Sequence, residues 1–241
     1  MTNLMIFPLY IAPSAIGLIV FNTLLLIFYG IRALYNKSKD KKEKKRKLAS
    51  LPVFNESYTG MHNGHKYVDM GLPSGTLWAT CNIGAYSPNE AGYFFDWGYT
   101  TASNRPNDKK TVFNIPRLDP YHDAATTNWG GPWRIPTKAE FEELINSCLW
   151  FPANCAGKQG FMIVGPNQNS VFLPLTGYYC WGDKKPFLPD SGGYYWTCQQ
   201  LEQADKVKQA YCMRFRYDGD AKIEEMWKLL LLPIRPVLPT H

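Results

Sequence analysis

The first hydrophobic segment of the chain carries no charge, since every side chain from Met1 to Ile31 is uncharged. A continuous run rich in Leu, Ile and Phe extends from Ser14 to Ile31 and can continue as a helix through Tyr35. A helix needs roughly 20 apolar residues to cross the hydrocarbon core of a bilayer. A cleaved signal peptide is disfavoured, because no basic segment precedes the run and no small-residue cleavage site follows it. The pattern therefore predicts a retained, single N-terminal transmembrane helix within residues 1–35.

The next segment, residues 36–50, is a basic linker. Between Arg32 and Lys47 there are nine Lys and Arg residues against Asp40 and Glu43. A solvated linker and a contact with anionic lipid headgroups are both compatible with this charge. The positive-inside rule favours an outside N-terminus and a cytoplasmic C-terminal domain. The membrane-proximal basic residues are Lys37, Lys39, Lys41, Lys42, Lys44, Lys45, Arg46 and Lys47.

Residues 51–241 alternate between short apolar patterns and turn-rich stretches, which predicts one globular domain with many short strands. Residues 224–232 fit either a strand or a short helix. The stretch from Tyr86 to Tyr121 is predicted to be a long irregular region, because it is rich in Asn, Pro, Asp and Gly. The predicted strands are 64–70, 76–83, 161–164, 171–173, 194–198, 210–217 and 234–238.

A helix is predicted to begin just after Pro136. Thr137 and Glu140 have the spacing of a capping box, in which each side chain binds a free main-chain N–H of the first turn. Apolar residues then follow at helical spacing and define one buried face, namely Phe141, Leu144, Ile145 and Cys148. With the scattered strands and long loops, this helix indicates an α+β domain.

The positive charge of the chain is concentrated in the basic linker and not in the domain. The formal net charge is +6, but beyond Lys47 there are 17 Lys and Arg against 18 Asp and Glu, so the domain is nearly neutral. Nucleic acid is therefore not expected as its partner. Aromatic residues make up 15% of the chain, which favours strands and aromatic packing over a helical bundle.

Several motifs resemble the bacterial Fibrobacter succinogenes major paralogous domain family, and in the same order, over about residues 62–238. They are Gly64–Ala85, Phe95–Gly98, Tyr121–Ala125, Trp129–Thr137, Leu173–Pro174, Tyr194–Trp196 and Ile234–Val237. That family is similar to the C-type lectin-like and formylglycine-generating-enzyme-like group. The resemblance implies a compact lectin-like fold, with a twisted antiparallel sheet, a packed helix and long loops on one side. It also implies binding of proteins or glycans at the bacterial surface, which would place the domain outside the cell.

Catalytic and metal-binding residues are not predicted. The stretch from Trp133 to Phe141 resembles formylglycine-generating enzymes, but those enzymes need a closely spaced reactive Cys pair, and Cys198 and Cys212 are far apart in sequence. The residues Gly165-Pro166-Asn167 lack the acidic residue of the calcium-dependent lectin motif. The six cysteines contain no CxxC pair, which disfavours zinc, and their redox state is left open. No cofactor is predicted.

Two aromatic clusters border the loop between 178 and 196, and aromatic rings beside polar groups commonly hold sugars or protein hot spots. Trp181, Asp183 and Tyr194 are therefore the candidate ligand-binding residues. The leading hypothesis is a membrane-anchored, non-enzymatic recognition module that binds a protein or a glycan through its loop face. The alternative is a cytoplasmic, membrane-attached structural or assembly scaffold, and a weaker one is an enzyme related to the formylglycine generators.

Overall fold

The computed structural model describes residues 26, 29–39, 42–43, 46, 49–103, 110–180, 185–203 and 208–240. The chain forms two compact units, Met1–Ser50 and Leu51–His241. In the first unit the described residues 29–39 are helical and exposed. Among the predicted basic residues, Lys37, Lys39, Lys42 and Arg46 lie on exposed helical positions, whereas Lys41, Lys44, Lys45 and Lys47 lie outside the described residues.

The predicted transmembrane anchor is not supported by this structure. No helix within the described residues is long and apolar enough to cross a membrane, so the predicted fold class, a domain behind a transmembrane helix, is wrong. The described helical stretch 29–39 is short and carries Arg32, Lys37 and Lys39. Most of the apolar run behind the prediction, residues 14–25 with 27 and 28, lies outside the described residues.

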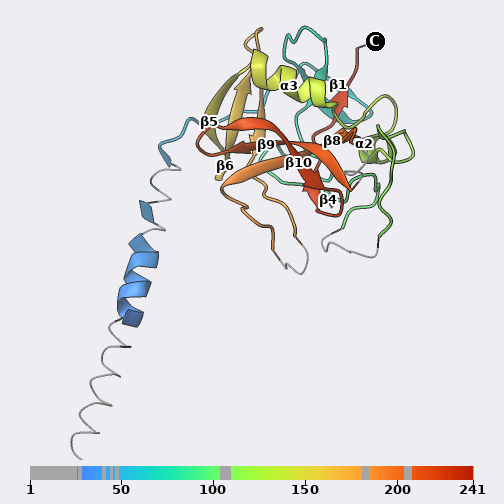
Figure 1. Ribbon diagram of the computed structural model, residues 1–241. Coiled ribbons are helices and arrows are strands. Elements are labelled where there is room, and N and C mark those ends of the chain that lie inside the picture. The colour runs from blue at the N-terminus through green and yellow to red at the C-terminus, as the bar shows by residue number, and fades with distance from the viewer. Residues whose placement is uncertain are drawn as a thin grey trace, which may run out of the picture. The chain divides into compact units, whose positions relative to one another are not determined.

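The second unit is built mainly from small antiparallel sheets, with few helices (Figure 1). Four sheets are present among the described residues, whereas one twisted sheet was predicted. The first has the order β1-β2-β3-β12 and the second pairs β4 with β11; the other two are β5-β6-β7 and β10-β9-β8. The bounds are β1 Gly60–His62, β2 His65–Asp69, β3 Leu77–Ala79, β4 Phe94–Phe95, β5 Leu149–Cys155, β6 Lys158–Val164, β7 Ser170–Pro174, β8 Gly192–Gln200, β9 Gln209–Arg216, β10 Ala221–Trp227, β11 Leu232–Pro233 and β12 Val237–Leu238.

Strand β3 shows why the sheets are short. The sequence predicts a strand to Ile83, but β3 ends at Ala79. The carbonyls of Ala79 and Thr80 accept hydrogen bonds from the guanidinium of Arg235 instead of continuing a ladder. Both faces of the following segment are also buried, with Asn82 and Ile83 almost inaccessible. A side chain has thus taken the place of a neighbouring strand.

The predicted helix is confirmed as α3, Lys138–Ser147, with Thr137 as its N-cap. The capping box is present: the Glu140 N–H donates to Thr137 Oγ1 at 3.1 Å, and the Thr137 N–H donates to Glu140 Oε2 at 2.7 Å. Phe141 and Leu144 are fully buried, as the spacing predicts. The helix packs against β8, β9 and β10 (Figure 1). A second helix, α2 Ala124–Trp129, was not predicted and is capped by Asp123.

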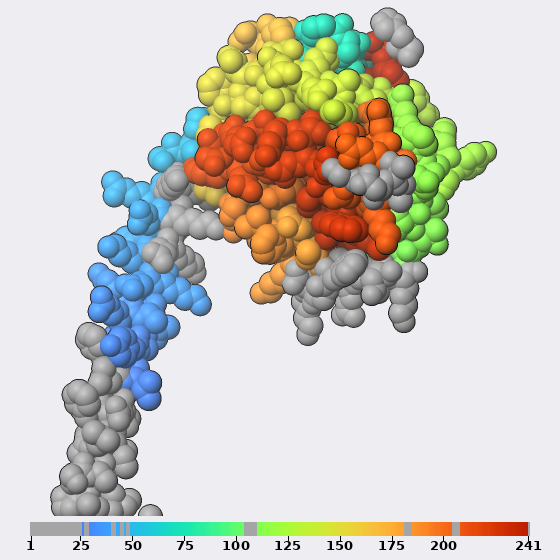
Figure 2. Space-filling model, viewed as in Figure 1, coloured from blue at the N-terminus to red at the C-terminus, as the bar shows by residue number. Residues whose placement is uncertain are grey.

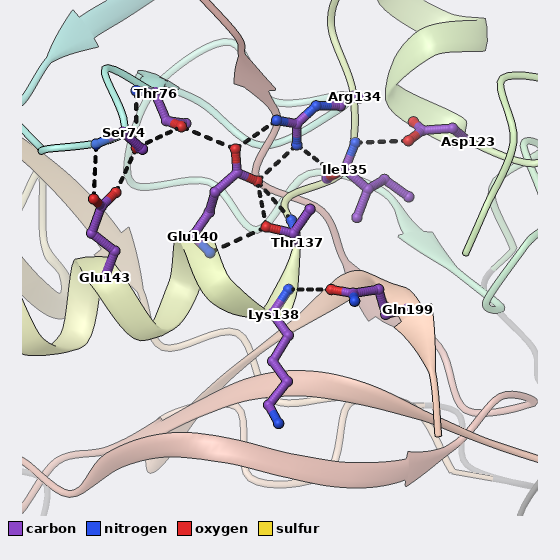
Figure 3. Close-up of polar contacts among 10 residues, drawn as sticks. All are labelled: Ser74, Thr76, Asp123, Arg134, Ile135, Thr137, Lys138, Glu140, Glu143 and Gln199. Atoms are coloured by element: carbon purple, nitrogen blue, oxygen red, sulfur yellow. Dashed lines mark hydrogen bonds and ion pairs between the residues drawn. The ribbon is translucent and has the colours of Figure 1, made fainter. Parts of the chain in front are cut away.

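Glu140 is buried, and three donor groups besides those of its cap residue bind its carboxylate (Figure 3). Both guanidinium nitrogens of Arg134 donate to its carboxylate, one of them at 2.7 Å, and the Thr76 hydroxyl donates at 2.9 Å. Burial opposes the ionisation of Glu140, but the bonds from Arg134 and Thr137 outweigh it and hold the pKa of this carboxyl below its ordinary value. The carboxylate therefore joins the start of α3 to the turn before β3.

Lys228, directly after β10, is a buried lysine, with only 1% of its surface exposed. Its ammonium donates to the Phe113 carbonyl at 2.8 Å and to Gln200 Oε1 at 2.7 Å, and lies 4.3 Å from the centre of the Trp97 ring. A neutral lysine amine has two N–H groups, and Lys228 has these two acceptors. Loss of the third proton therefore leaves no N–H group of Lys228 without an acceptor. Burial lowers the pKa of Lys228 to about 8.

Replacing Glu140 by Ala is expected to lower the free energy of unfolding by about 3 kcal/mol, since it removes the cap and leaves Arg134 half-buried without its carboxylate. Chemical denaturation followed by tryptophan fluorescence measures this. Glu142→Ala, a change on the exposed side of the same helix, should stay within about 0.5 kcal/mol of the wild type. Equal losses in the two variants would contradict the role given to Glu140.

Lys228 gives the chain a pH dependence of stability that Lys228→Met should lack. Between pH 8 and the ordinary lysine pKa of about 10.4 the unfolded chain binds more protons than the folded one, so this contribution to stability rises with pH. We expect the free energy of unfolding of the wild type, relative to Lys228→Met, to increase by about 2 kcal/mol from pH 7.5 to 9.5. Urea denaturation of both proteins at the two pH values checks it. A constant difference would show that Lys228 titrates normally.

Candidate functional site

An open groove of about 500 Å³ lies between the β1–β2 hairpin, the segment after β3 and the end of α2. Its walls combine aromatic rings, a thioether, a thiol and an imidazole. The side chains that define this aromatic groove are Met61, His65, Cys81, Tyr86, Tyr93 and Trp129.

Two tyrosines on one loop are held out of the core at this groove. Tyr86 is 96% exposed and Tyr93 is 54% exposed. The ring of Tyr93 lies over Gly84, where φ is +76° and a Cβ atom would come within 2.4 Å of the ring. Gly84 is therefore required both for the left-handed backbone and for the close approach of the ring.

The loop that carries these tyrosines, residues 83–93, is tied to itself and to the core. The Tyr86 N–H donates to Glu90 Oε2 at 2.8 Å, and the Tyr93 N–H donates to the Ile83 carbonyl at 2.8 Å. Asn82 is fully buried, and its amide nitrogen donates to the Ala91 carbonyl at 2.9 Å. The loop is thus preorganised although its two aromatic side chains are exposed.

Arg235 in turn holds Asn82. Its Nε donates to Asn82 Oδ1 at 2.8 Å, and its terminal nitrogens donate to the carbonyls of Ala79, Thr80 and Phe172 at 2.7–3.0 Å. The side chain is fully buried, and burial lowers the pKa of its guanidinium from the ordinary value. One cation therefore connects the end of β3, strand β7 and the loop of the groove.

The opposite wall of the groove comes from a hairpin and a helix end. Asn63 and Gly64 both have positive φ, the geometry of a tight two-residue turn between β1 and β2. This hairpin places the imidazole of His65 flat on the Trp129 ring, with 3.8 Å between ring centres and 7° between planes. The Trp129 carbonyl accepts a bond from the Asn63 amide at 3.3 Å, which fixes the hairpin to α2.

The groove has little net charge. Lys66 pairs with Glu56 at 3.3 Å and lies 4.8 Å from the centre of the Tyr58 ring. Burial lowers the pKa of His65, so its imidazole is neutral at pH 7. Burial also raises the pKa of the Cys81 thiol, which keeps it protonated. The surface available to a ligand is therefore aromatic and has no net charge, with hydroxyl, amide and imidazole groups beside one ion pair.

A smaller cavity of about 290 Å³ lies beside Asp123, Arg134 and Cys198. The Asp123 carboxylate is occupied by hydrogen bonds within the fold, because it accepts from the main-chain N–H groups of Ala125, Thr126 and Ile135 at 2.8–3.0 Å. Burial raises the pKa of Cys198 to about 11, so it is a thiol at neutral pH. The bond from the Ile135 N–H to Asp123 and the Arg134–Glu140 pair are drawn in Figure 3 and maintain the fold.

The cysteines do not form the reactive pair of the formylglycine generators. Cys198 and Cys212 are both free and buried, and burial also raises the pKa of Cys212 far above that of an ordinary thiol. A protonated thiol is a poor nucleophile. Within the described residues no group of three His, Cys, Asp or Glu side chains could hold a metal ion.

Of the three candidate ligand-binding residues from the sequence, the structure describes Tyr194. Trp181 and Asp183 lie outside the described residues. Tyr194 is in β8 and only 4% exposed, and its ring packs against that of Tyr178, with 4.8 Å between the ring centres, so it does not line the aromatic groove. The sequence did contain one signal for the actual groove, because Asn63-Gly64 is the strongest short-range mark of a hairpin.

Comparison of the chain with protein-family models, with curated proteins and with solved structures gives no match. The resemblance to the Fibrobacter succinogenes major paralogous domain family stays a prediction.

Replacing Arg235 by Met would leave four buried oxygen acceptors without a donor. We expect the free energy of unfolding to fall by at least about 3 kcal/mol, a large part of the stability of a typical domain. Urea denaturation tests this, with Lys208→Met, a change at an exposed position, as the control. A loss below about 1 kcal/mol would mean that water or another side chain replaces the guanidinium.

Proposed function

We propose that residues 51–241 form a non-enzymatic recognition module and that the aromatic groove is its binding site. The observation that supports this most directly is the exposure of Tyr86 and Tyr93 on an anchored loop. Large aromatic rings gain free energy when they leave water, so a rigid loop that holds two of them outside the core favours a ligand.

The preorganisation of the groove also supports a binding role. Ordering a flexible loop on binding costs conformational entropy, and this cost is reduced when the loop is already fixed. Here Asn82 and Glu90 fix the loop, and the Asn63 amide fixes the opposite hairpin. Both walls can therefore meet a ligand without rearrangement of the main chain.

Of the two ligand classes expected, a protein and a glycan, the chemistry of the groove favours an uncharged glycan. Sugar rings present apolar C–H faces, which stack on tyrosine and tryptophan, and hydroxyl groups, which bond to neutral polar groups. The single lysine of the groove is already paired with Glu56, so a strongly acidic ligand would have to displace that carboxylate. A volume of about 500 Å³ is within the range of small-ligand sites.

Screening the full chain on a glycan array, followed by calorimetric titration of the best oligosaccharide, tests the proposal. We expect Tyr86→Ala and Tyr93→Ala each to weaken binding about tenfold, which corresponds to about 1.4 kcal/mol. Tyr121→Ala is the matched control, since Tyr121 is 88% exposed but does not line the groove.

Unchanged affinity in both groove variants would exclude this site. Binding of a protein but of no glycan, with the same sensitivity to Tyr86 and Tyr93, would keep the recognition role and change the ligand class.

A further inference from the structure

A second groove, of about 380 Å³, lies between helix α3 and strand β10. Figure 2 shows the yellow-green surface of α3 directly beside the orange-red surface of β9 and β10. On the helix the lining residues Lys138, Glu142 and Ile145 are spaced as one stripe. On the strand the lining is continuous from Ala221 to Glu225. Successive side chains of a strand point to opposite faces, so a continuous lining means that the edge of β10 itself borders the groove.

The register of β10 shows which main-chain groups point into this space. At one end of the β9–β10 pair the Arg216 N–H donates to the Asp220 carbonyl, and beyond the other end the Lys228 N–H donates to the Lys208 carbonyl. Hydrogen-bonded pairs alternate along an antiparallel ladder. Counting from either end with the observed register, Lys222 and Glu224 bond to β9. The N–H and C=O groups of Ala221 and Ile223 therefore point away from β9.

Strand β10 has a partner on one side only. It is terminal in the order β10-β9-β8, and no isolated bridge among the described residues involves it. An edge strand presents a row of main-chain donors and acceptors to another chain. Proteins often block such edges with charges. Here, however, the charge of Lys222 is already paired with that of Glu224 at 3.1 Å. Helix α3 lies beside the edge, and the groove lies between the helix and the edge.

We propose that this α3–β10 groove binds an extended peptide segment of a partner protein, which adds to β10 as a further strand. The main chain of the peptide bonds to Ala221 and Ile223, and alternate side chains face Ile145 and Tyr211 at the side of α3. The groove contains three glutamates and two lysines, and both lysines are paired within it, Lys138 with Glu142 and Lys222 with Glu224. Glu224 is also paired with Arg214 at 3.0 Å, so recognition in this groove depends on the main chain of the peptide and not on its charge.

This site is separate from the aromatic groove, with which it shares no residue. Strand addition recognises main-chain geometry, whereas stacking in the aromatic groove recognises ring faces. The two proposals therefore fail independently.

The probe for this site is a phage-displayed library of linear 12-residue peptides, selected against the full chain. The best sequence is synthesised, and its affinity is measured by fluorescence polarisation. It is then resynthesised with one N-methyl group at each position in turn. Strand addition predicts that methylation weakens binding at least tenfold at every second position and less than twofold at the positions between, because only alternate N–H groups of the added strand face β10.

The matching change on the protein is Ala221→Pro. It removes one N–H that points into the groove and leaves the bonds of Lys222 to β9 in place, as an edge position permits. We expect at least tenfold weaker binding, and less than a twofold change for Ala221→Ser, which keeps the N–H. The N-methyl scan needs no protein variant, so it decides the matter if Ala221→Pro does not fold.

The proposal is overturned if no peptide is selected, if N-methylation has no two-residue period, or if a folded Ala221→Pro variant binds as the wild type. Loss of peptide binding in Tyr86→Ala would place the peptide in the aromatic groove and overturn it as well. Concentration-dependent dimerisation in sedimentation that Ala221→Pro abolishes would assign the edge to a second copy of the chain instead.

Discussion

The buried guanidinium of Arg235 is the interaction on which this structure most depends. A charge can be taken out of water only when its donors are satisfied. Here that is done without a carboxylate, by three main-chain carbonyls and the amide oxygen of Asn82. These acceptors belong to segments that are far apart in sequence, so the cation replaces ladder bonds that short strands cannot supply. The small sheets are consistent with a domain held together at such points and not by one extended sheet.

The proposed binding surface follows from the same constraint. Asn82 accepts from Arg235 and donates to the loop that carries Tyr86 and Tyr93. The exposed side chains of Tyr86 and Tyr93 therefore belong to a loop whose main chain is hydrogen-bonded to the buried Asn82. Gly84 adds a geometric requirement, because its positive φ lets the Tyr93 ring lie flat against the backbone. The rigidity of the groove is thus a property of the core and does not need the ligand.

The sequence predicted the features that depend on neighbours in the chain. The capping box and apolar face of α3 are confirmed because Thr137, Glu140, Phe141 and Leu144 act within one helix. The aromatic groove could not be predicted, since it joins segments from about residue 56 to 129 whose approach is set by Arg235 and by the His65–Trp129 stack. The burial of Tyr194 could not be predicted for a related reason. In an aromatic stretch that is buried on both faces, alternation does not reveal which ring is exposed.

The two grooves differ in the physical property that each would recognise, and this difference comes from the secondary structure around them. The aromatic groove is lined by loops and element ends, whose main-chain groups are largely used internally, so side-chain rings form its surface. The α3–β10 groove is lined by the edge of a regular strand, where every second residue leaves its main-chain groups outside the ladder. A helix packed beside that edge restricts what can pair with it. Selectivity in the second groove therefore depends on the fit of a whole extended backbone between Ile145 and Ile223.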